Sequence, residues 1–246
     1  MIIKKSSCAL MVLMLVVGVL LAGVVYSAEP TGTLTISWPE IFNSIDPHTN
    51  DTQRVYWSVI APNIFDHLIE RNVDAQLVPG LATSWKNIEP TIWEFTLREG
   101  VKFHNGEPFN AEAVKYTFER MFEKNAPCLF LFSNIKKVEV IDNYTVQIFT
   151  SKPFGALPAN LTLAEIVPPV AGQKPEFSTH PIGTGPFKFE EWIKGEKFSM
   201  VANKDYWGGV PKVERVIAYP LTEEATRVSG LRAGKLDIIH SVPSQE

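Results

Sequence analysis

The chain has 246 residues, 45% of them hydrophobic, and a formal net charge of −4 at pH 7. This length and composition predict a globular protein with a substantial core, and the acidic balance argues against a nucleic-acid-binding surface. Because Cys8 and Cys128 are the only cysteines, a cysteine-based metal cluster is excluded.

The first 28 residues have the layout of a secretory signal peptide. Lys4 and Lys5 precede an uncharged run over residues 9–25, and Tyr26-Ser27-Ala28 follows it. This pattern predicts cleavage after residue 27 or 28, and therefore export from the cytoplasm. Since the apolar run is about as long as the shortest membrane span, an uncleaved N-terminal membrane anchor is the alternative.

After this segment, the chain begins with a short strand and a long loop. Residues 33–38 are β-prone, and the loop that follows carries aromatic residues without a surrounding apolar pattern. We therefore expect the rings of Trp38 and Phe42 to face a cleft. Apolar residues at helical spacing then predict a helix over residues 54–70, which Pro62 must kink or split.

The most strongly patterned stretch runs from Trp93 to Arg120. Residues 77–85 form a turn and a short packing segment that leads into it. Alternating apolar residues predict one strand over residues 93–97 and, after a Glu-Gly break, a second over residues 101–104. Asn110 is then the expected N-cap of a helix.

Strand patterns continue on both sides of a proline-rich connector. A hairpin is predicted over residues 135–149, and residues 151–181 connect it to the rest of the chain. Three further strands are predicted at residues 187–192, 197–201 and 215–219.

A helix and a short strand end the pattern. Residues 223–233 form the predicted helix, with Thr222 as its N-cap and Gly234 as its C-terminal stop. The apolar strand over residues 236–239 follows at once, which is typical of the second half of a βαβ crossover. We expect it to join the same sheet as the strand at residues 215–219.

No HExxH or GxSxG motif is present, and the five histidines are scattered without metal-ligand spacing. Gly183-Thr184-Gly185 lacks the third glycine and the helix that a dinucleotide site needs. Asp46, His48 and Asp51 could bind a metal, but an Asp-Pro turn that stabilises the loop explains them better. Cys128 lies in an apolar run that is typical of a packing residue. The sequence therefore predicts no catalytic residue, no metal and no cofactor.

Six short blocks occur in a fixed order along the chain. They are Ile45-Asp46-Pro47, residues 77–85, residues 93–120, Pro181-Ile182-Gly183-Thr184-Gly185-Pro186-Phe187, residues 203–211 and Gly234-Lys235-Leu236-Asp237-Ile238. In this order they resemble the extracytoplasmic solute-binding proteins of the peptide, nickel and opine class, which serve ATP-driven (ABC) importers. Each block alone is weak evidence, but together they span nearly all of the chain after residue 28.

The resemblance implies an α/β fold of the periplasmic-binding-protein type. It implies a discontinuous first lobe, with a mixed sheet and helices, over residues 29–64 and 181–246. A smaller α+β subdomain over residues 65–180 would be inserted into it. Members of this family are considerably longer and continue into a second lobe, so we expect this chain to be an N-terminal fragment that lacks that lobe.

The implied function is the capture of di- or oligopeptides in the periplasm, by a monomer that delivers them to the membrane permease subunits of an ABC importer. Such binders close two lobes around the ligand by hinge bending. We expect Trp38, Glu40, Phe42 and Asn43 to line the cleft. The rings would offer apolar contact, and Glu40 or the backbone would hydrogen-bond an extended ligand. Packing within the lobe is the alternative for each of them.

Other ligands and other functions stay open at this point. Nickel chelates, opines, haem and oligosaccharides are the alternatives to peptides. A secreted hydrolase is an alternative of another class, although the sequence shows no nucleophile–base pair or metal cluster for it. A fragment that binds a protein partner through an exposed apolar face of the lobe is the third possibility.

Overall fold

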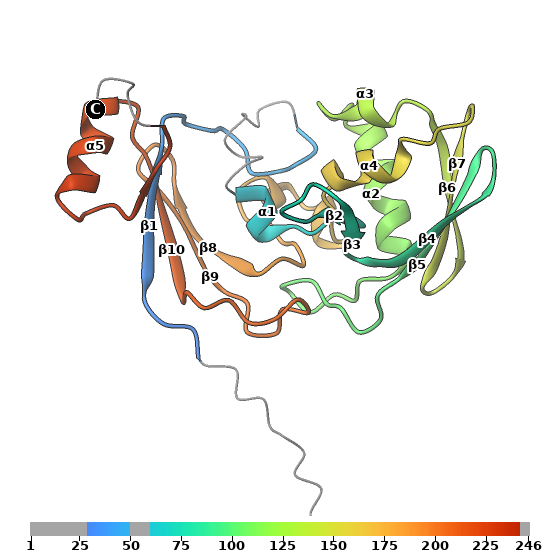
Figure 1. The fold of residues 1–246 in the computed structure, drawn as a ribbon, viewed down its shortest axis with the longest axis horizontal. Coiled ribbons are helices and arrows are strands. Elements are labelled where there is room, and N and C mark those ends of the chain that lie inside the picture. Colours follow the sequence, from blue (N-terminus) through green and yellow to red (C-terminus); the bar gives the residue numbers. More distant parts are fainter. Residues whose placement is uncertain (1–28, 50–59, 242–246) are drawn as a thin grey trace, which may run out of the picture.

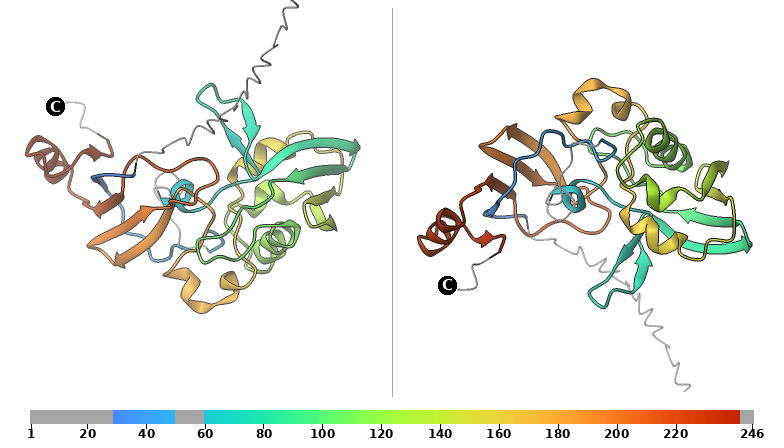
Figure 2. Two further views of the ribbon diagram at one scale, coloured as in Figure 1. Left: turned by 90° about the horizontal axis from the view of Figure 1, so that it is seen from below. Right: turned by 90° about the horizontal axis from the view of Figure 1, so that it is seen from above.

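Two β-sheets at opposite ends of the molecule dominate the computed structural model, which describes residues 29–49 and 60–241 (Figure 1). Between the sheets lie helix α1 (Ala61–Ile64) and the hairpin of β2 (Ile69–Arg71) and β3 (Leu77–Pro79). The two views of Figure 2 show the same separation of the sheets. The predicted signal peptide over residues 1–28 lies outside the described residues. No helix in the described ranges is long and apolar enough to cross a membrane.

A five-stranded sheet combines the two ends of the described chain. Its strands, in order across the sheet, are β11 (Ile238–Ile239), β1 (Thr33–Trp38), β10 (Arg215–Pro220), β9 (Lys197–Ala202) and β8 (Phe187–Ile193). Strand β1 is parallel to both of its neighbours, whereas β9 is antiparallel to β10 and to β8. The chain passes from β10 through helix α5 (Glu224–Arg232) to β11, so the predicted crossover and the shared sheet are confirmed.

A four-stranded antiparallel sheet forms the other end of the molecule. Its strands, in order, are β4 (Ala82–Glu89), β5 (Ile92–Leu97), β7 (Thr145–Thr150) and β6 (Ile135–Asp142). The predicted hairpin is thus β6–β7. Helix α2 (Ala111–Glu123) contacts β6 and β7. The Asn110 side chain accepts a hydrogen bond from the Ala113 N–H at 3.2 Å, which confirms the predicted N-cap.

Each sheet has its own hydrophobic core. Val114, Phe118 and Met121 of α2 are at most 1% exposed and pack over the four-stranded sheet. The second core lies on one face of the five-stranded sheet and includes Trp38 and Phe198. The short elements that complete the fold are α3 (Leu129–Phe132), α4 (Leu157–Asn160) and the 3₁₀ turns Leu161–Leu163, Ala171–Gln173 and Pro175–Ser178.

The second strand predicted within the stretch from Trp93 to Arg120 is wrong. Residues 101–104 form a loop in which Lys102 and Pro108 make a single isolated bridge. The backbone groups are used inside this loop, because the Phe103 N–H donates to the Glu107 carbonyl at 2.8 Å. The predicted pattern of burial is nevertheless correct, since Val101 and Phe103 are buried in the core.

The helix predicted over residues 54–70 is wrong beyond Ile64, and its first part lies outside the described residues. Helix α1 ends at Ile64, Phe65 is extended with ψ at 146°, and strand β2 follows. Pro62 lies in the first turn of α1, where a helix does not need its missing N–H.

Two smaller expectations also need correction. Residues 82–89, which begin inside the predicted turn and packing segment, form β4. This strand lies at the edge of its sheet and exposes most of its residues, so it shows no apolar alternation. The N-cap position of α5 is Glu223 rather than Thr222, and no side chain caps the helix there. Gly234, with φ at +66°, ends this helix region as predicted.

Candidate functional site

The carboxyl ends of four strands meet at one edge of the five-stranded sheet. Strands β1, β8, β10 and β11 run in the same direction, because β9 is antiparallel to its two neighbours. In open α/β sheets, ligands bind in the crevice outside the carboxyl ends of the strands. The loop over residues 39–49, which follows β1, therefore leaves the sheet where a ligand is expected.

Three aromatic rings, one each from β1, this loop and β8, stack on one another. The ring centroids of Trp38 and Phe42 are 5.7 Å apart at an interplanar angle of 25°, and those of Phe42 and Trp192 are 5.2 Å apart at 26°. Trp38 and Phe42 are only 1% and 4% exposed, so in the described chain they pack inside the second core. Trp192, at the end of the stack, is half-buried and was not predicted as a site residue. Its only sequence signal was its place in a predicted strand.

The polar members of the predicted set lie nearer the surface. Glu40 is half-buried, and its backbone carbonyl accepts a hydrogen bond from the Trp38 indole N–H. Asn43 is exposed and lines a hollow of about 500 Å³, together with His180, Phe189 and Trp192. The structure thus brings the two predicted aromatic residues together and places Asn43 on an open surface that it shares with Trp192. Ligand contact by these four residues stays a prediction.

A buried ion pair anchors the far end of the loop. The two carboxylate oxygens of Asp46 accept hydrogen bonds from the Arg120 guanidinium at 2.8 and 2.6 Å, and both side chains are at most 4% exposed. Burial alone would raise the pKa of Asp46, but the hydrogen bonds and the charge of Arg120 hold it below its usual value. Asp46 also accepts the N–H of His48 at 3.0 Å, as expected of an Asp-Pro turn.

The metal alternative for this turn gains no support from the geometry. Asp51 lies outside the described residues, and within the described ranges no group of three His, Cys, Asp or Glu side chains could hold a metal ion. The His48 ring is fully buried. Burial and the nearby charge of Arg120 lower the pKa of His48 to about 3, so this ring stays neutral.

The two halves of the fold meet at a junction, which we define as residues 64–67, 104, 183–185 and 203–207. Asp66 is 4% exposed, and its carboxylate accepts three hydrogen bonds: from Thr184 Oγ1 at 2.8 Å, Tyr206 Oη at 3.0 Å and Trp207 Nε1 at 2.7 Å. Burial raises the pKa of Asp66 despite these donors. Thr184 thereby shapes the return of the chain into the five-stranded sheet.

His104 bridges the same junction through both ring nitrogens. Its Nε2 lies 2.9 Å from the Gly185 carbonyl, and its Nδ1 accepts the Gly183 N–H at 3.3 Å. These partners require the neutral ring with the proton on Nε2. Burial lowers the pKa of His104 to about 4, which agrees with that form. His104 therefore has a structural role, which periodicity in the sequence could not reveal.

A second buried polar group lies beside Asp66. His67 Nδ1 is 3.0 Å from Glu70 Oε1, and its Nε2 is 3.9 Å from Glu165 Oε1. Burial opposes the charge on His67, but the two carboxylates outweigh it and raise the pKa of His67 to about 10. Cys128 is also buried, and burial raises the pKa of its thiol to about 12, as expected of a packing residue rather than a nucleophile.

The features that support a ligand site are therefore aromatic surfaces, backbone groups and amides at the carboxyl edge of the five-stranded sheet. Such groups bind a solute by apolar contact and hydrogen bonds. The buried groups Asp46, Asp66 and His104, whose pKa values are shifted, are instead engaged in structural contacts at the junction and at the end of the loop.

The comparisons with known proteins agree with this description. Residues 76–246 match the model of the bacterial extracellular solute-binding proteins, family 5 Middle. The glutathione-binding protein GsiB of Pectobacterium atrosepticum is 31% identical over 218 residues, which cover 83% of this chain and 41% of the relative. The nickel-binding periplasmic protein of Escherichia coli (strain K12) is 27% identical over 228 residues, 88% of this chain and 42% of the relative.

A solved structure shows the same architecture. It is that of the ABC transporter-associated periplasmic binding protein DppA from Helicobacter pylori in complex with the peptide STSA, with a TM-score of 0.78 and 28% identity. The match covers 87% of this chain and 48% of that one. The predicted fold class is thus confirmed, and the chain spans less than half the length of the curated relatives it matches.

Proposed function

We propose that this chain, which belongs to the bacterial extracellular solute-binding proteins of family 5, captures small peptides outside the cytoplasm for an ABC importer. The observation that carries this proposal is the likeness to a binding protein in complex with a tetrapeptide, at a TM-score of 0.78 over 87% of the chain. The glutathione-binding relative supports the same ligand class, because glutathione is itself a small peptide.

The surface above the five-stranded sheet suits an extended, partly apolar ligand. Trp192 presents part of its ring beside the exposed side chain of Asn43, and Ile41 is 43% exposed. We infer that Trp38 and Phe42 support this wall from below, while Glu40 and Asn43 offer polar contacts.

The organisation proposed for the chain follows from its two cores. Residues 29–64 and 181–246 would form a first lobe around the five-stranded sheet, and residues 65–180 a subdomain around the four-stranded sheet. The two clusters under the sheets support a division of this kind, with Phe65, Val167 and Phe177 of the subdomain packing into the core of the first lobe. We further propose removal of residues 1–28 on export, a monomeric state, and delivery of the ligand to membrane permease subunits.

A nickel chelate is the second candidate ligand, because of the nickel-binding relative. A chelated nickel ion needs no cluster of protein side chains, and within the described ranges no cluster of three metal-binding side chains is present. Opines, haem and oligosaccharides belong in the same test.

Titration of the purified protein with di- to pentapeptides, glutathione, nickel–histidine, an opine, haem and an oligosaccharide tests this proposal, with tryptophan fluorescence and melting temperature as readouts. A saturable change in both signals with peptides is expected. Glu40→Gln should raise the Kd roughly tenfold if its carboxylate contacts the ligand, while Glu89→Gln, on the exposed edge strand β4, should leave it unchanged.

Two outcomes would contradict peptide capture. One is a complete lack of response to every peptide at millimolar concentration, together with a response to a non-peptide ligand. The other is a hydrolytic activity, on any tested peptide or ester, that co-purifies with the protein. This activity would favour the hydrolase alternative.

A further inference from the structure

The hollow beside Asn43 is built from three separate segments of the chain. One wall comes from the loop after β1, a second from the turn over residues 179–180, and a third from the end of β8. The residues that line it are Asn43, Thr179, His180, Phe189, Glu190, Glu191, Trp192 and Lys194. The first two walls do not belong to strands, so their positions depend on contacts outside the sheet.

Arg120, on helix α2, contacts the segments that carry both of these walls. Its two terminal guanidinium nitrogens donate to the carboxylate of Asp46 at 2.8 and 2.6 Å, three residues beyond Asn43. Its Nε donates to the Gly172 carbonyl at 3.0 Å, and its guanidinium carbon lies 5.1 Å from the centroid of the Phe177 ring, just before the second wall. One side chain thus connects the loop to the 3₁₀ turns before the second wall. We call this set of contacts the arginine clamp.

Asn43 lies between the arginine clamp and the aromatic stack. On the side of the clamp, the Ile45 N–H donates to the Ser178 carbonyl at 2.9 Å, which joins the loop to the start of the second wall by a backbone hydrogen bond. On the other side, the Phe42 ring stacks against Trp192. The exposed side chain of Asn43 is therefore fixed from both directions along the chain.

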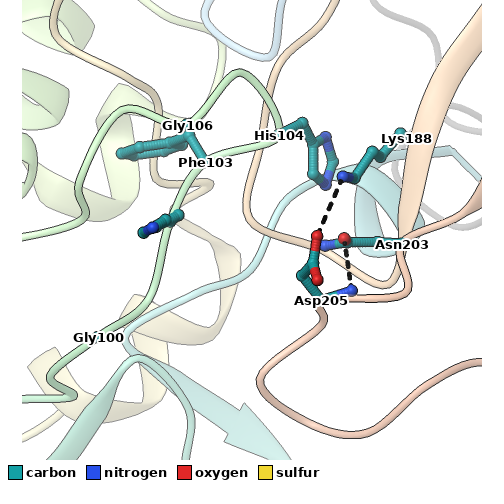
Figure 3. Close-up of a pocket in the computed structure, with 8 residues that line it drawn as sticks. Gly100, Phe103, His104, Gly106, Lys188, Asn203 and Asp205 are labelled. Atoms are coloured by element: carbon teal, nitrogen blue, oxygen red, sulfur yellow. Dashed lines mark hydrogen bonds and ion pairs between the residues drawn. The ribbon is translucent and has the colours of Figure 1, made fainter.

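The polar hollow at the junction is held together differently. It has a volume of about 400 Å³ and is lined in part by Lys188, Asn203 and Asp205. Figure 3 shows that these residues contact one another: Lys188 Nζ lies 3.9 Å from Asp205 Oδ2, and Asn203 accepts the Asp205 N–H at 3.2 Å. These polar groups are thus engaged within their own hollow, whereas two walls of the hollow beside Asn43 depend on a buried side chain that does not line it.

The geometry of the clamp requires an arginine. Arg120 and Asp46 are at most 4% exposed, and a planar guanidinium can donate to two carboxylate oxygens and a carbonyl at once. A lysine ammonium keeps the charge but cannot reproduce this fork. Lys124 Nζ lies 4.0 Å from the same Asp46 oxygen as the shorter Arg120 bond, but its side chain is 40% exposed, so its contribution is small.

We propose that Arg120 is a positioning residue for solute capture, which holds Asn43 and the turn over residues 179–180 in the arrangement that accepts a ligand. This inference rests on the proposed function, because it assigns the hollow beside Asn43 to the ligand. Arg120 itself does not touch the ligand. Its loss lowers the fraction of molecules whose hollow is ready to bind, and the apparent affinity falls by that fraction.

Stopped-flow binding of the peptide tetra-alanine, followed by tryptophan fluorescence, tests this role. Arg120→Lys should raise the Kd about five- to tenfold. The association rate constant should fall by the same factor and the dissociation rate constant should change by less than about twofold, because the bound hollow makes the same ligand contacts. Lys124→Gln, on the same helix and near the same carboxylate, is the matched control and should bind as the wild type does.

Hydrogen–deuterium exchange tests the clamp without a ligand. In Arg120→Lys, the backbone amides of residues 43–46 and 178–180 should exchange at least about tenfold faster than in the wild type. The amides of the β6–β7 hairpin should keep their wild-type rates, because the clamp does not contact them.

A double variant separates positioning from the cost of an unpaired buried charge. Asp46→Asn/Arg120→Gln removes both charges together and keeps an oxygen that can accept the His48 N–H, so neither charge is left without its partner. It lacks the bidentate contact, so it should show the same faster exchange and the same slower association as Arg120→Lys.

Several results would overturn the positioning role. An unchanged Kd in Arg120→Lys would show that the ion pair serves folding alone. Faster dissociation with unchanged association would show that Arg120 stabilises the bound complex and does not prepare the hollow. Faster exchange in the β6–β7 hairpin as well would show general destabilisation. A wild-type protein that does not respond to tetra-alanine contradicts peptide capture, whereas unchanged exchange of residues 43–46 and 178–180 contradicts the clamp itself.

Discussion

Two regions of the molecule are stabilised by different kinds of interaction. One is the four-stranded sheet with helix α2, and the other is the junction. The sheet and helix bury apolar side chains at regular spacing, with Phe118 and Val146 fully enclosed. The junction instead depends on close backbone contacts and on buried polar groups such as Asp66 and His104. Periodic patterns therefore specify the scaffold, whereas the connection between its parts depends on single residues that no period marks.

The largest expected effect tests the close backbone contact at the junction. A Cβ atom at Gly183 would lie 1.9 Å from the Ile64 carbonyl oxygen, which belongs to the backbone and cannot move aside cheaply. Gly183→Ala should therefore lower the free energy of unfolding by more than about 4 kcal/mol, or prevent folding. The matched control is Gly155→Ala, because a Cβ there meets no atom within 4 Å. Urea denaturation of both variants measures the difference, and equal stability would contradict the close contact.

A core substitution in the four-stranded half should have the next largest effect. Phe118→Ala removes a side chain that is 1% exposed and packs edge-on against Phe132. We expect a loss of about 3–5 kcal/mol. Phe130→Ala, on a ring that is 74% exposed, should change stability by less than about 0.5 kcal/mol. Chemical denaturation distinguishes the two, and a comparable loss in both would mean that Phe130 is buried in solution.

A substitution of Asp66 tests whether its buried hydrogen bonds stabilise the junction. Asp66→Asn keeps the shape of the side chain but replaces one acceptor oxygen with a donor that faces Thr184, Tyr206 or Trp207. The expected loss is about 1–3 kcal/mol. Asp74→Asn, on an exposed side chain of the β2–β3 turn, serves as control. If Asp66→Asn unfolds at the same urea concentration as the wild type, the three hydrogen bonds do not stabilise the junction.

His104 predicts the direction of the pH dependence. The folded-state pKa of about 4 lies below the ordinary value of 6.5, so the unfolded chain binds a proton that the native chain does not. Stability should therefore fall as the pH falls from 6.5 to 4. His104→Gln removes this protonation site. The loss in the free energy of unfolding between pH 6.5 and pH 4 should therefore be about 1–2 kcal/mol smaller in the variant than in the wild type. His48 contributes in the same direction to both proteins, so their difference isolates His104. Parallel pH–stability curves would contradict the assignment.

Most of the scaffold could be predicted from the sequence because its elements bury one face at a regular period. Strand β5, the β6–β7 hairpin, helix α2 and the β10–α5–β11 crossover all follow such patterns. Strand β4 could not be predicted, since an exposed edge strand has no apolar alternation. The end of the short helix α1 could not be predicted either. The apolar residues at positions 60–69 are spaced in a way that buries them equally well in a helix, a bend or a strand.

The candidate site was less predictable than the scaffold. The sequence indicated an aromatic loop after β1, but it could not show that the rings of Trp38 and Phe42 pack downward against Trp192, which is distant in the chain. Likewise, Asp66 and His104 acquire their roles only when the chain brings residues 183–207 beside them. Contacts of this kind depend on tertiary structure and leave no local signal.

Hydrogen–deuterium exchange of the purified protein, with and without a saturating ligand from the titration panel, tests the central claim most directly. We predict that the ligand protects the backbone amides of residues 40–43 and of Trp192, at the carboxyl edge of the five-stranded sheet, and leaves α2 unchanged. A bound ligand that protects only residues of the four-stranded half, with residues 40–43 exchanging as in the free protein, would contradict it.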